Sequence, residues 1–395
     1  MRRTGVAVAA AALLALAGAG PAAAAERPPR VEARAWILVD ADTGDVLVSH
    51  AAARELPVAS TTKLMTAYVA LHELPLDRIV RAAPYAAGYG ESLLNLRAGQ
   101  RISVRDLLYG LILRSGNDAA YDLARAAAGS ERRFVRQMNE YAAALGLSDT
   151  HFANPIGLDQ RGNHSSARDL ATLTRRLLAL PTFARIAASR RAVLRSVRPR
   201  RRIETIDELL RMAPWVTGVK TGHTFGARYV LVGSGRRKGV ELIAVVIGAP
   251  TDEDRFRDDL ELLEYGFSRY RRRLPVRAGE ALARPSIRYA GGELPLRAAR
   301  SVAVGVRPGQ RVEVSVRAPH EVEGPIRRGA PLGAAIVSVA DRHVATVALR
   351  AGRAVAEAST FDVVRSFVEG KAIWFVLALS GILIAVAIVL RRRLR

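Results

Sequence analysis

Apolar residues recur with two different periods along the chain. Two short apolar runs, 36–39 and 46–48, flank the turn-forming cluster Asp42-Thr43-Gly44-Asp45 and predict a β-hairpin. Helical spacing follows in 64–71, 104–113, 119–128 and 134–145. Strand-like runs return at 229–232 and 242–247, before a last predicted helix over about 254–270. Strands at both ends with helices between them predict an α+β domain with an antiparallel sheet and a separate helical cluster.

The pattern of apolar and polar residues changes after Leu274-Pro275. Short alternating runs such as 301–304 and 311–316, punctuated by Gly and Pro, predict a small all-β domain over 275–355. We expect the first domain to occupy 26–274 and a linker to cover 356–371.

Both ends of the chain carry targeting signals. Residues 1–25 begin with two arginines, continue as an Ala- and Leu-rich run and reach Ala23-Ala24-Ala25, the layout of a signal peptide cleaved after Ala25. The uncharged segment 372–390 would extend roughly 28 Å as a helix at about 1.5 Å per residue, which predicts one transmembrane helix. The basic tail 391–395 is expected in the cytoplasm, which places the body of the chain outside the membrane.

The chain is strongly basic, with a formal net charge of +23 at pH 7. Such a charge is typical of nucleic-acid binding, but an exported body does not meet genomic DNA, so anionic lipid head groups and wall polymers are the expected partners. A codon bias toward Arg explains the charge equally well. Segment 190–202 holds seven Arg and is predicted to be a solvated loop or hairpin surface, with a specific anion site as the alternative.

Several chemistries are excluded by composition. The chain has no Cys, so disulfides, thiolate metal sites and a Cys nucleophile are ruled out. The seven His lack metal-ligand spacing, and no Gly-Lys-Ser/Thr phosphate loop occurs. We therefore expect no metal and no cofactor.

The first candidate catalytic segment is Ser60-Thr61-Thr62-Lys63, where the first helical pattern starts. One helical turn would bring the Lys63 amine within reach of the Ser60 hydroxyl. Only four of the 60 basic residues are lysines, and a buried Lys can lose its proton whereas Arg cannot, so a retained Lys is a candidate for chemistry. The alternative is that Ser60 only caps the helix.

Two further candidate segments contain polar residues at points where the helical or strand-like spacing of apolar residues is interrupted. Ser115-Gly116-Asn117 lies between two helical runs, where a hydroxyl and an amide can point into a cleft or Asn117 can cap the next helix. Lys220-Thr221-Gly222 leads into a strand pattern, where Gly permits close approach of an extended peptide or the polar residues merely make a sheet edge soluble.

The order and spacing of these three segments resemble penicillin-binding proteins and class A β-lactamases. Over about 34–270 the chain resembles a low-molecular-mass penicillin-binding protein of the D-alanyl-D-alanine carboxypeptidase family, also in 57–60, 151–158, 164–170 and 218–224. The resemblance implies a β-lactamase/transpeptidase-like catalytic domain, and 275–355 resembles the family's C-terminal β domain only in position and texture. One departure is Thr205-Ile206-Asp207-Glu208, where the family usually has an Asn-containing segment before Leu-Leu.

The resemblance implies a serine acyl-transfer cycle on a peptidoglycan stem peptide ending in D-Ala-D-Ala, with β-lactams as covalent inhibitors. Its implied roles are Ser60 as nucleophile, Lys63 as a neutral base, Ser115 as the proton relay, and a substrate-binding set of Asn117, Lys220, Thr221, Gly222, His223 and Arg255. The backbone N–H groups of Ser60 and His223 would form the oxyanion hole, while Thr221 and Arg255 would hold the terminal carboxylate.

Other functions stay open to different degrees. A D,D-endopeptidase that cuts crosslinks would use the same residues. A class A β-lactamase needs a Glu that activates the deacylating water, usually within Glu-x-x-Leu-Asn, and we expect no such segment in this chain. A nonenzymatic wall-binding protein would not need Ser60 or Lys63, and a nucleic-acid module is disfavoured by the predicted export and anchor.

Overall fold

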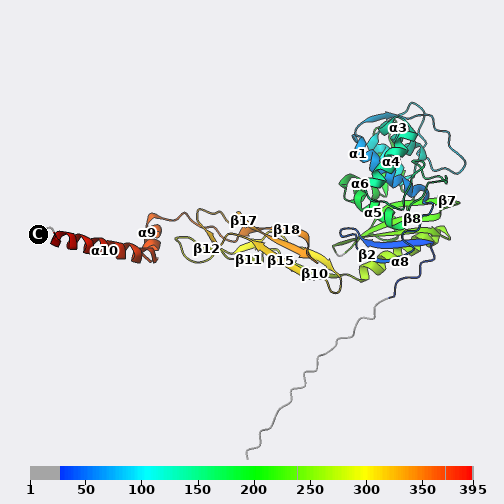
Figure 1. Cartoon of the computed structure of the whole chain (residues 1–395). Coiled ribbons are helices and arrows are strands. Elements are labelled where there is room, and N and C mark those ends of the chain that lie inside the picture. The colour runs from blue at the N-terminus through cyan, green and yellow to red at the C-terminus, as the bar shows by residue number, and fades with distance from the viewer. Residues whose placement is uncertain (1–26, 238, 370, 394–395) are drawn as a thin grey trace, which may run out of the picture.

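A computed structural model describes residues 27–237, 239–369 and 371–393 of the chain. It has an N-terminal α+β domain, an elongated β domain beside it, and two C-terminal helices at the opposite end of the β domain (Figure 1). The domain limits predicted above stay predictions, but the β domain's first strand begins at Arg271 and pairs with a strand of that same domain.

A five-stranded antiparallel sheet organises the first domain. Its order is β2-β1-β9-β8-β7, so the N-terminal hairpin pairs with strands from far along the chain. The strands are β1 (Ala35–Asp40), β2 (Val46–His50), β7 (Val216–Thr224), β8 (Arg228–Arg237) and β9 (Val240–Ala249). The predicted hairpin and the predicted sheet of N- and C-terminal strands are confirmed, and β7 is left as a sheet edge.

The central strand β9 is buried on both faces of the sheet. Because side chains alternate along a strand, Ile243, Val245 and Ile247 join the core under the helical cluster. Leu242, Ala244 and Val246 join the second core, under α8 (Asp252–Ser268). This explains why the sequence shows an uninterrupted apolar run there instead of an alternating one.

Helices form a cluster on one face of the sheet (Figure 1). They are the short 3₁₀ helix η1 (Ala59–Thr62), α1 (Lys63–Glu73), α2 (Val104–Leu113), α3 (Asn117–Ala128), α4 (Glu131–Ala144), α5 (Ala167–Leu178) and α6 (Pro181–Ala187). The short helix α7 (Leu209–Met212) instead contributes Leu209 and Leu210 to the second core, with α8. Two small hairpins flank the cluster, β3 (Ile79–Arg81) with β4 (Arg101–Ser103) and β5 (Arg191–Leu194) with β6 (Arg201–Glu204). The Arg-rich segment 190–202 is therefore largely a hairpin.

The helix predicted over about 254–270 begins and ends two residues earlier. The Thr251 hydroxyl accepts a hydrogen bond from the Asp254 backbone N–H at 3.1 Å, which caps the first turn of α8. That turn also contains Asp252, Glu253 and Asp254, whose negative charges interact favourably with the positive end of the helix dipole. Sequence periodicity follows the buried apolar residues and so misses this polar first turn.

The β domain has its own apolar core. A five-stranded sheet of order β11-β13-β18-β17-β15 is accompanied by the pair β10-β14 and the parallel pair β12-β16. The strands are β10 (Arg271–Val276), β11 (Ala281–Ala283), β12 (Ser286–Ile287), β13 (Leu296–Ala298), β14 (Val302–Val306), β15 (Val312–Arg317), β16 (Glu321–Val322), β17 (Pro331–Val339) and β18 (Arg342–Ala351). The predicted all-β texture of this region is confirmed.

The targeting predictions have different outcomes. The predicted signal peptide, 1–25, lies outside the described residues. After α9 (Thr360–Glu369), the C-terminal segment forms α10 (Lys371–Arg393), whose described apolar side chains run from Leu377 to Ile388 and include Leu390. Among the described residues no helix combines the length and the apolar character needed to cross a membrane, so the transmembrane helix predicted over 372–390 is not confirmed.

Candidate active site

Ser60 and Lys63 meet at the junction of η1 and α1. The Lys63 Nζ lies 2.8 Å from Ser60 Oγ and donates a second hydrogen bond to the Ile156 carbonyl at 2.6 Å. The Ser60 side chain makes no helix-capping hydrogen bond in the structure. The sequence left open whether Ser60 caps the helix or pairs with Lys63. The geometry favours the pairing of the Ser60 hydroxyl with the Lys63 amine.

Lys63 is completely buried. Burial disfavours the charged amine, and Lys220 nearby adds repulsion, so the pKa of Lys63 lies well below its usual value of 10.5. The carboxylates of Glu91 and Asp118 oppose this shift only in part. A neutral amine beside a serine hydroxyl can accept its proton, which is what an activated serine nucleophile requires.

Ser115, in the turn before α3, and Lys220, on the edge strand β7, form a second buried pair. Lys220 Nζ donates to Ser115 Oγ at 3.0 Å and to the Thr221 carbonyl at 2.6 Å. Ser115 has φ +56°, a left-handed conformation that strains a non-glycine residue and directs it out of the turn after α2. Burial lowers the pKa of Lys220 to about 7, although Asp207 opposes the shift.

Asp207 belongs to the segment Thr205-Ile206-Asp207-Glu208, where the sequence departs from the family's usual Asn-containing segment. Its carboxylate is buried and accepts a hydrogen bond from the Leu209 backbone N–H at 3.1 Å, while Oδ2 has no partner among the described residues. Burial raises its pKa to about 6, and the charges of Lys220 and Arg255 oppose this shift. Asp207 thus supplies negative charge behind Lys220, a role that depends on contacts across the fold and leaves no signal in the sequence.

The edge strand β7 carries the predicted substrate-binding segment. A Cβ added to Gly222 would lie 3.1 Å from the Ser60 backbone nitrogen, so β7 packs closely against η1. The Arg255 guanidinium donates to the Gly222 carbonyl at 2.9 Å. The exposed His223 ring stacks on Tyr229 with centroids 4.3 Å apart. Thr221, in the same segment, is buried.

Gly157 packs closely against the backbone that precedes Ser60. Its φ is +89°, and a Cβ at that position would lie 2.0 Å from the Ala59 carbonyl oxygen. Ala59 itself has φ +48°. Only glycine fits this left-handed position against the backbone that precedes Ser60. The loop that supplies the Ile156 carbonyl to Lys63 is therefore pressed directly onto η1.

Glu91 corrects one expectation from the sequence. Glu91-Ser92-Leu93-Leu94-Asn95 does match Glu-x-x-Leu-Asn, and Glu91 Oε2 accepts a hydrogen bond from Asn117 Nδ2 at 2.7 Å. Asn117 therefore uses its side chain toward Glu91 and does not cap α3, whose cap is Gly116. The structure places a partly buried carboxylate beside the predicted site, where no glutamate was predicted.

The structure thus brings together most of the predicted site residues. Ser60 contacts Lys63, Ser115 contacts Lys220, and Arg255 contacts Gly222. Asn117 and Gly116 adjoin the loop that carries Glu91. No group of three or more metal-ligating side chains occurs in the part of the chain that the structure describes.

The model of one protein family, described as D-alanyl-D-alanine carboxypeptidase, matches residues 22–251. The chain belongs to the D-alanyl-D-alanine carboxypeptidase family. This makes the protein a serine-type carboxypeptidase and a penicillin-binding protein whose substrate is peptidoglycan. The resemblance drawn from the three short segments is confirmed.

Individual relatives agree with this family. The carboxypeptidase is 30% identical to D-alanyl-D-alanine carboxypeptidase DacF of Bacillus subtilis over 316 residues, 78% of this chain and 81% of DacF. It is 39% identical to DacD of Escherichia coli, over 61% of this chain and 64% of DacD. Penicillin-binding protein 5 of Haemophilus influenzae is similar in structure, with a TM-score of 0.59, 28% identity and coverage of 84% of this chain and 99% of that one.

The buried Lys63 amine leads to a first prediction. Lys63→Arg should reduce the rate of acylation by penicillin about 10²- to 10⁴-fold, because guanidinium cannot lose its proton and act as a base. The measurement is the time course of labelling with a fluorescent penicillin. Lys238→Arg, a substitution outside the three candidate segments of the sequence, is the matched control and should label at the wild-type rate. Labelling of the Lys63→Arg variant at the wild-type rate would contradict the role of Lys63 as the base.

Proposed function

We propose that the carboxypeptidase removes the terminal D-alanine from peptidoglycan stem pentapeptides through an acyl-enzyme on Ser60. The observation that carries this proposal is the 2.8 Å contact between Ser60 Oγ and the buried Lys63 amine. Lys63 accepts the hydroxyl proton, and Ser60 Oγ attacks the carbonyl carbon between the two D-alanines.

The second buried pair serves the leaving group. Ser115 passes a proton to the amine of the departing D-alanine and is reprotonated by the proton that Lys63 took from Ser60, so Lys63 is neutral in the acyl-enzyme. Lys220 orients the Ser115 hydroxyl through their 3.0 Å hydrogen bond. The backbone N–H groups of Ser60 and His223 stabilise the oxyanion of the tetrahedral intermediate, where each donor typically contributes about 3 to 4 kcal/mol. The close packing of Gly222 on Ser60 supports this arrangement.

The substrate backbone extends along the edge of β7. Asn117 holds the peptide on one side, while Thr221 and Gly222 leave room for a strand-like ligand on the other. Thr221 and Arg255 bind the terminal carboxylate, since a guanidinium forms strong charge-assisted hydrogen bonds with carboxylates. Arg255 is already anchored to the Gly222 carbonyl, which supports its place at this end of the site.

Release of free D-alanine from a synthetic stem pentapeptide is the second prediction. The wild-type protein should release D-alanine, and Ser60→Ala should abolish release because the nucleophile is missing. Ser49→Ala, on the sheet hairpin away from the site, should keep full activity. If wild-type protein that penicillin still acylates releases no D-alanine, crosslinked peptidoglycan is the substrate, as the endopeptidase alternative requires.

We also propose that the enzyme works outside the cytoplasmic membrane and is attached to it by its C-terminal segment. The described apolar side chains of α10 are exposed, with Leu377, Leu379, Ile382, Leu383 and Ile384 each at least 56% accessible. Arginines follow immediately after Leu390. Exposed apolar side chains followed by cations suit a lipid interface, where the cations contact anionic head groups.

Truncation after Ser359 tests this attachment and is the third prediction. The full chain should sediment with membranes, whereas the truncated chain should be recovered in the soluble extracytoplasmic fraction because it lacks the exposed apolar segment. Activity on the stem pentapeptide should be equal in both. Co-sedimentation of the truncated chain with membranes would place the attachment elsewhere.

A further inference from the structure

We propose that Glu91 is the general base that activates water for hydrolysis of the acyl-enzyme on Ser60. The inference rests on the serine mechanism proposed above and concerns its second half. It starts from the contact between Glu91 and Asn117, two residues of the site that come from different elements.

Hydrogen bonds on both carboxylate oxygens hold Glu91 in place. Oε2 accepts from Asn117 Nδ2 at 2.7 Å and from the Tyr85 hydroxyl at 2.5 Å. Oε1 accepts from the Gly88 backbone N–H at 2.8 Å. The side chain is only partly buried, so water can reach it.

The loop that carries Glu91 is fixed to the start of α3. The Asp118 carboxylate accepts from the backbone N–H groups of Leu94 at 2.8 Å and Leu96 at 2.9 Å. The Asn117 backbone N–H donates to the Ser92 carbonyl at 2.8 Å. A carboxylate held by such a set of bonds is preorganised, as a catalytic group needs to be.

The charge state of Glu91 suits a base. Burial raises the pKa of Glu91, but the hydrogen bonds from Asn117, Tyr85 and Gly88 and the nearby Lys63 outweigh it and leave that pKa below its usual value. The group is therefore ionised at neutral pH. Glu91 and Lys63 also interact electrostatically, since the carboxylate raises the pKa of Lys63 and the amine lowers the pKa of Glu91.

Hydrolysis then proceeds with protons that balance. Glu91 takes a proton from a solvent water, and the water oxygen bonds to the ester carbonyl carbon. The tetrahedral intermediate collapses, and the bond from carbon to Ser60 Oγ breaks. The proton on Glu91 reaches Ser60 Oγ through the neutral Lys63 amine, which takes up one proton and gives one to Ser60. Glu91 ends ionised, Lys63 ends neutral and Ser60 regains its hydroxyl.

Glu91→Gln tests this fourth prediction, because the amide keeps an acceptor for Asn117 but cannot take a proton. Acylation should stay within a few-fold of wild type, while the half-life of the penicillin adduct lengthens about 10²-fold or more. On the stem pentapeptide kcat and KM should fall together, leaving kcat/KM nearly unchanged, since kcat/KM reports acylation and kcat the slow hydrolysis.

Tyr85→Phe is the matched control, because it removes another hydrogen bond to Glu91 Oε2 and keeps the carboxylate. Its adduct half-life should stay within a few-fold of wild type. An unchanged half-life in Glu91→Gln, or a kcat/KM that falls as far as kcat, would assign Glu91 to holding Asn117 and overturn the proposal. Failure of wild-type protein to form any adduct would instead contradict the serine mechanism itself.

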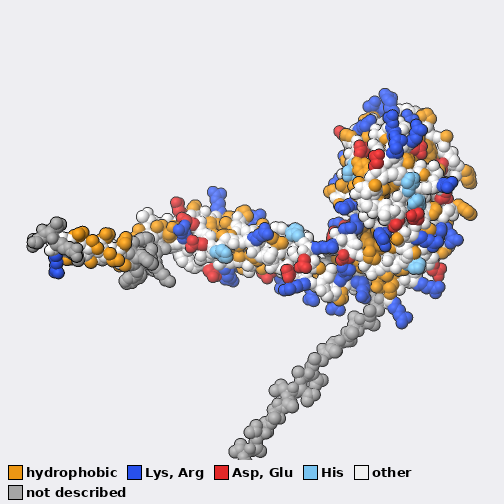
Figure 2. Space-filling view, in the orientation of Figure 1, with side chains coloured by type: hydrophobic (Ala, Val, Ile, Leu, Met, Phe, Trp, Pro, Cys, Tyr) orange, Lys and Arg blue, Asp and Glu red, His pale blue; other side chains and the backbone are white. Residues whose placement is uncertain are grey.

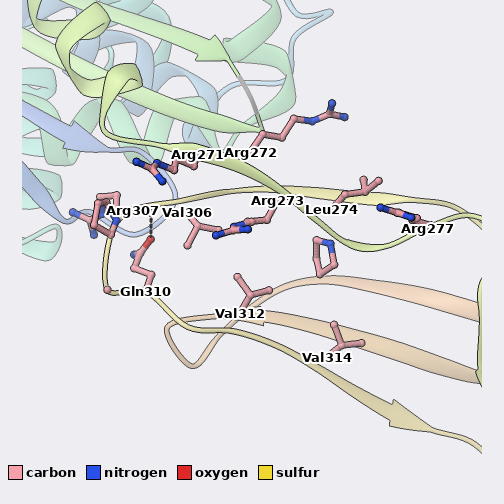
Figure 3. A pocket seen from close by; sticks show the side chains of 13 residues that line it. Arg271, Arg272, Arg273, Leu274, Arg277, Val306, Arg307, Gln310, Val312 and Val314 are labelled. Carbon is pink, nitrogen blue, oxygen red and sulfur yellow. Dashed lines mark hydrogen bonds between the residues drawn. The ribbon is translucent and has the colours of Figure 1, made fainter. Parts of the chain in front are cut away.

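A second inference comes from the β domain and is independent of the active site. A cavity of about 810 Å³ lies between β10, the start of β15 and the turn that joins β14 to β15. Five arginines line it, Arg271, Arg272, Arg273, Arg277 and Arg307, and its described lining contains no Asp or Glu. Figure 3 shows Arg271 and Arg307 at one end and Arg277 at the other, with Arg273 between them.

The charges of these arginines are largely uncompensated. Within the described chain, Arg271, Arg272, Arg273 and Arg277 form no ion pair, whereas Arg307 pairs with Asp45 of the catalytic domain. The Arg307 Nε is buried without a hydrogen-bond partner. Guanidinium groups collected around one cavity repel one another, and a bound anion relieves that repulsion.

We infer that this cavity binds phosphate groups of a polymer outside the membrane. Several arginines in a row match repeated phosphates, which a guanidinium can bind through two parallel hydrogen bonds. Leu274 and Val314 add exposed apolar surface between the charges, which suits carbon spacers between phosphates. The strands β10 and β15, which line the cavity, lie at the end of the β domain beside the catalytic domain and away from α10 (Figure 1), so a lipid head group at the C-terminal attachment is out of reach. Figure 2 shows Lys and Arg side chains gathered at this junction of the two domains.

Calorimetric titration of the full chain in nonionic micelles tests this fifth prediction, with a glycerol phosphate oligomer as probe. The triple variant Arg271→Gln, Arg272→Gln, Arg273→Gln should weaken binding at least tenfold. The matched triple Arg195→Gln, Arg200→Gln, Arg202→Gln on and beside the β5–β6 hairpin removes the same charge and should leave binding within twofold. D-alanine release should be unchanged in both triples.

Two outcomes would overturn this inference. Equal weakening by the two triples would mean that net charge alone attracts the polymer. Binding to micelles that contain phosphatidylglycerol, with none to the oligomer, would identify the source of phosphate as lipid.

Discussion

Two lysine amines buried in one cleft are the constraint on which the site depends. An ammonium group removed from water is unfavourable unless it loses its proton or gains partners, and both remedies are present here. Lys63 and Lys220 each donate to a serine hydroxyl and to a backbone carbonyl. Their mutual repulsion helps to keep Lys63 neutral. The chemistry of the site is therefore a consequence of burial.

Burial of the lysines requires that separate parts of the chain pack without gaps. The lysines are enclosed by η1, by the turn before α3, by the loop around Gly157 and by the edge strand β7. Two non-glycine residues, Ala59 and Ser115, adopt left-handed backbone conformations beside the reacting groups. Such strain persists because the surrounding cores determine the backbone on both sides. The rigid sheet and helical cluster thus position side chains that short segments alone could not hold.

The two carboxylates near the site have contrasting environments. Hydrogen bonds hold the pKa of the partly buried Glu91 below its usual value, whereas burial raises the pKa of Asp207 to about 6. One carboxylate can exchange protons with water and the other can only tune a neighbouring amine. The β domain adds a different kind of electrostatics, since its arginines face solvent and act on large anions over distances set by the ionic strength.

The sequence by itself determined four strands of the sheet, β1, β2, β8 and β9, together with the order of the three candidate segments and the family. It did so because these features depend on local periodicity and on rare residues, such as four lysines among so many arginines. Tertiary structure alone decided that Glu91 contacts Asn117 and that Asp207 lies behind Lys220. Glu91 stands in a loop without periodicity, so its match to Glu-x-x-Leu-Asn acquires meaning only when the loop is pinned to α3. Charge, burial and pKa depend on which distant segments share a cleft, and that is settled by packing across the whole fold.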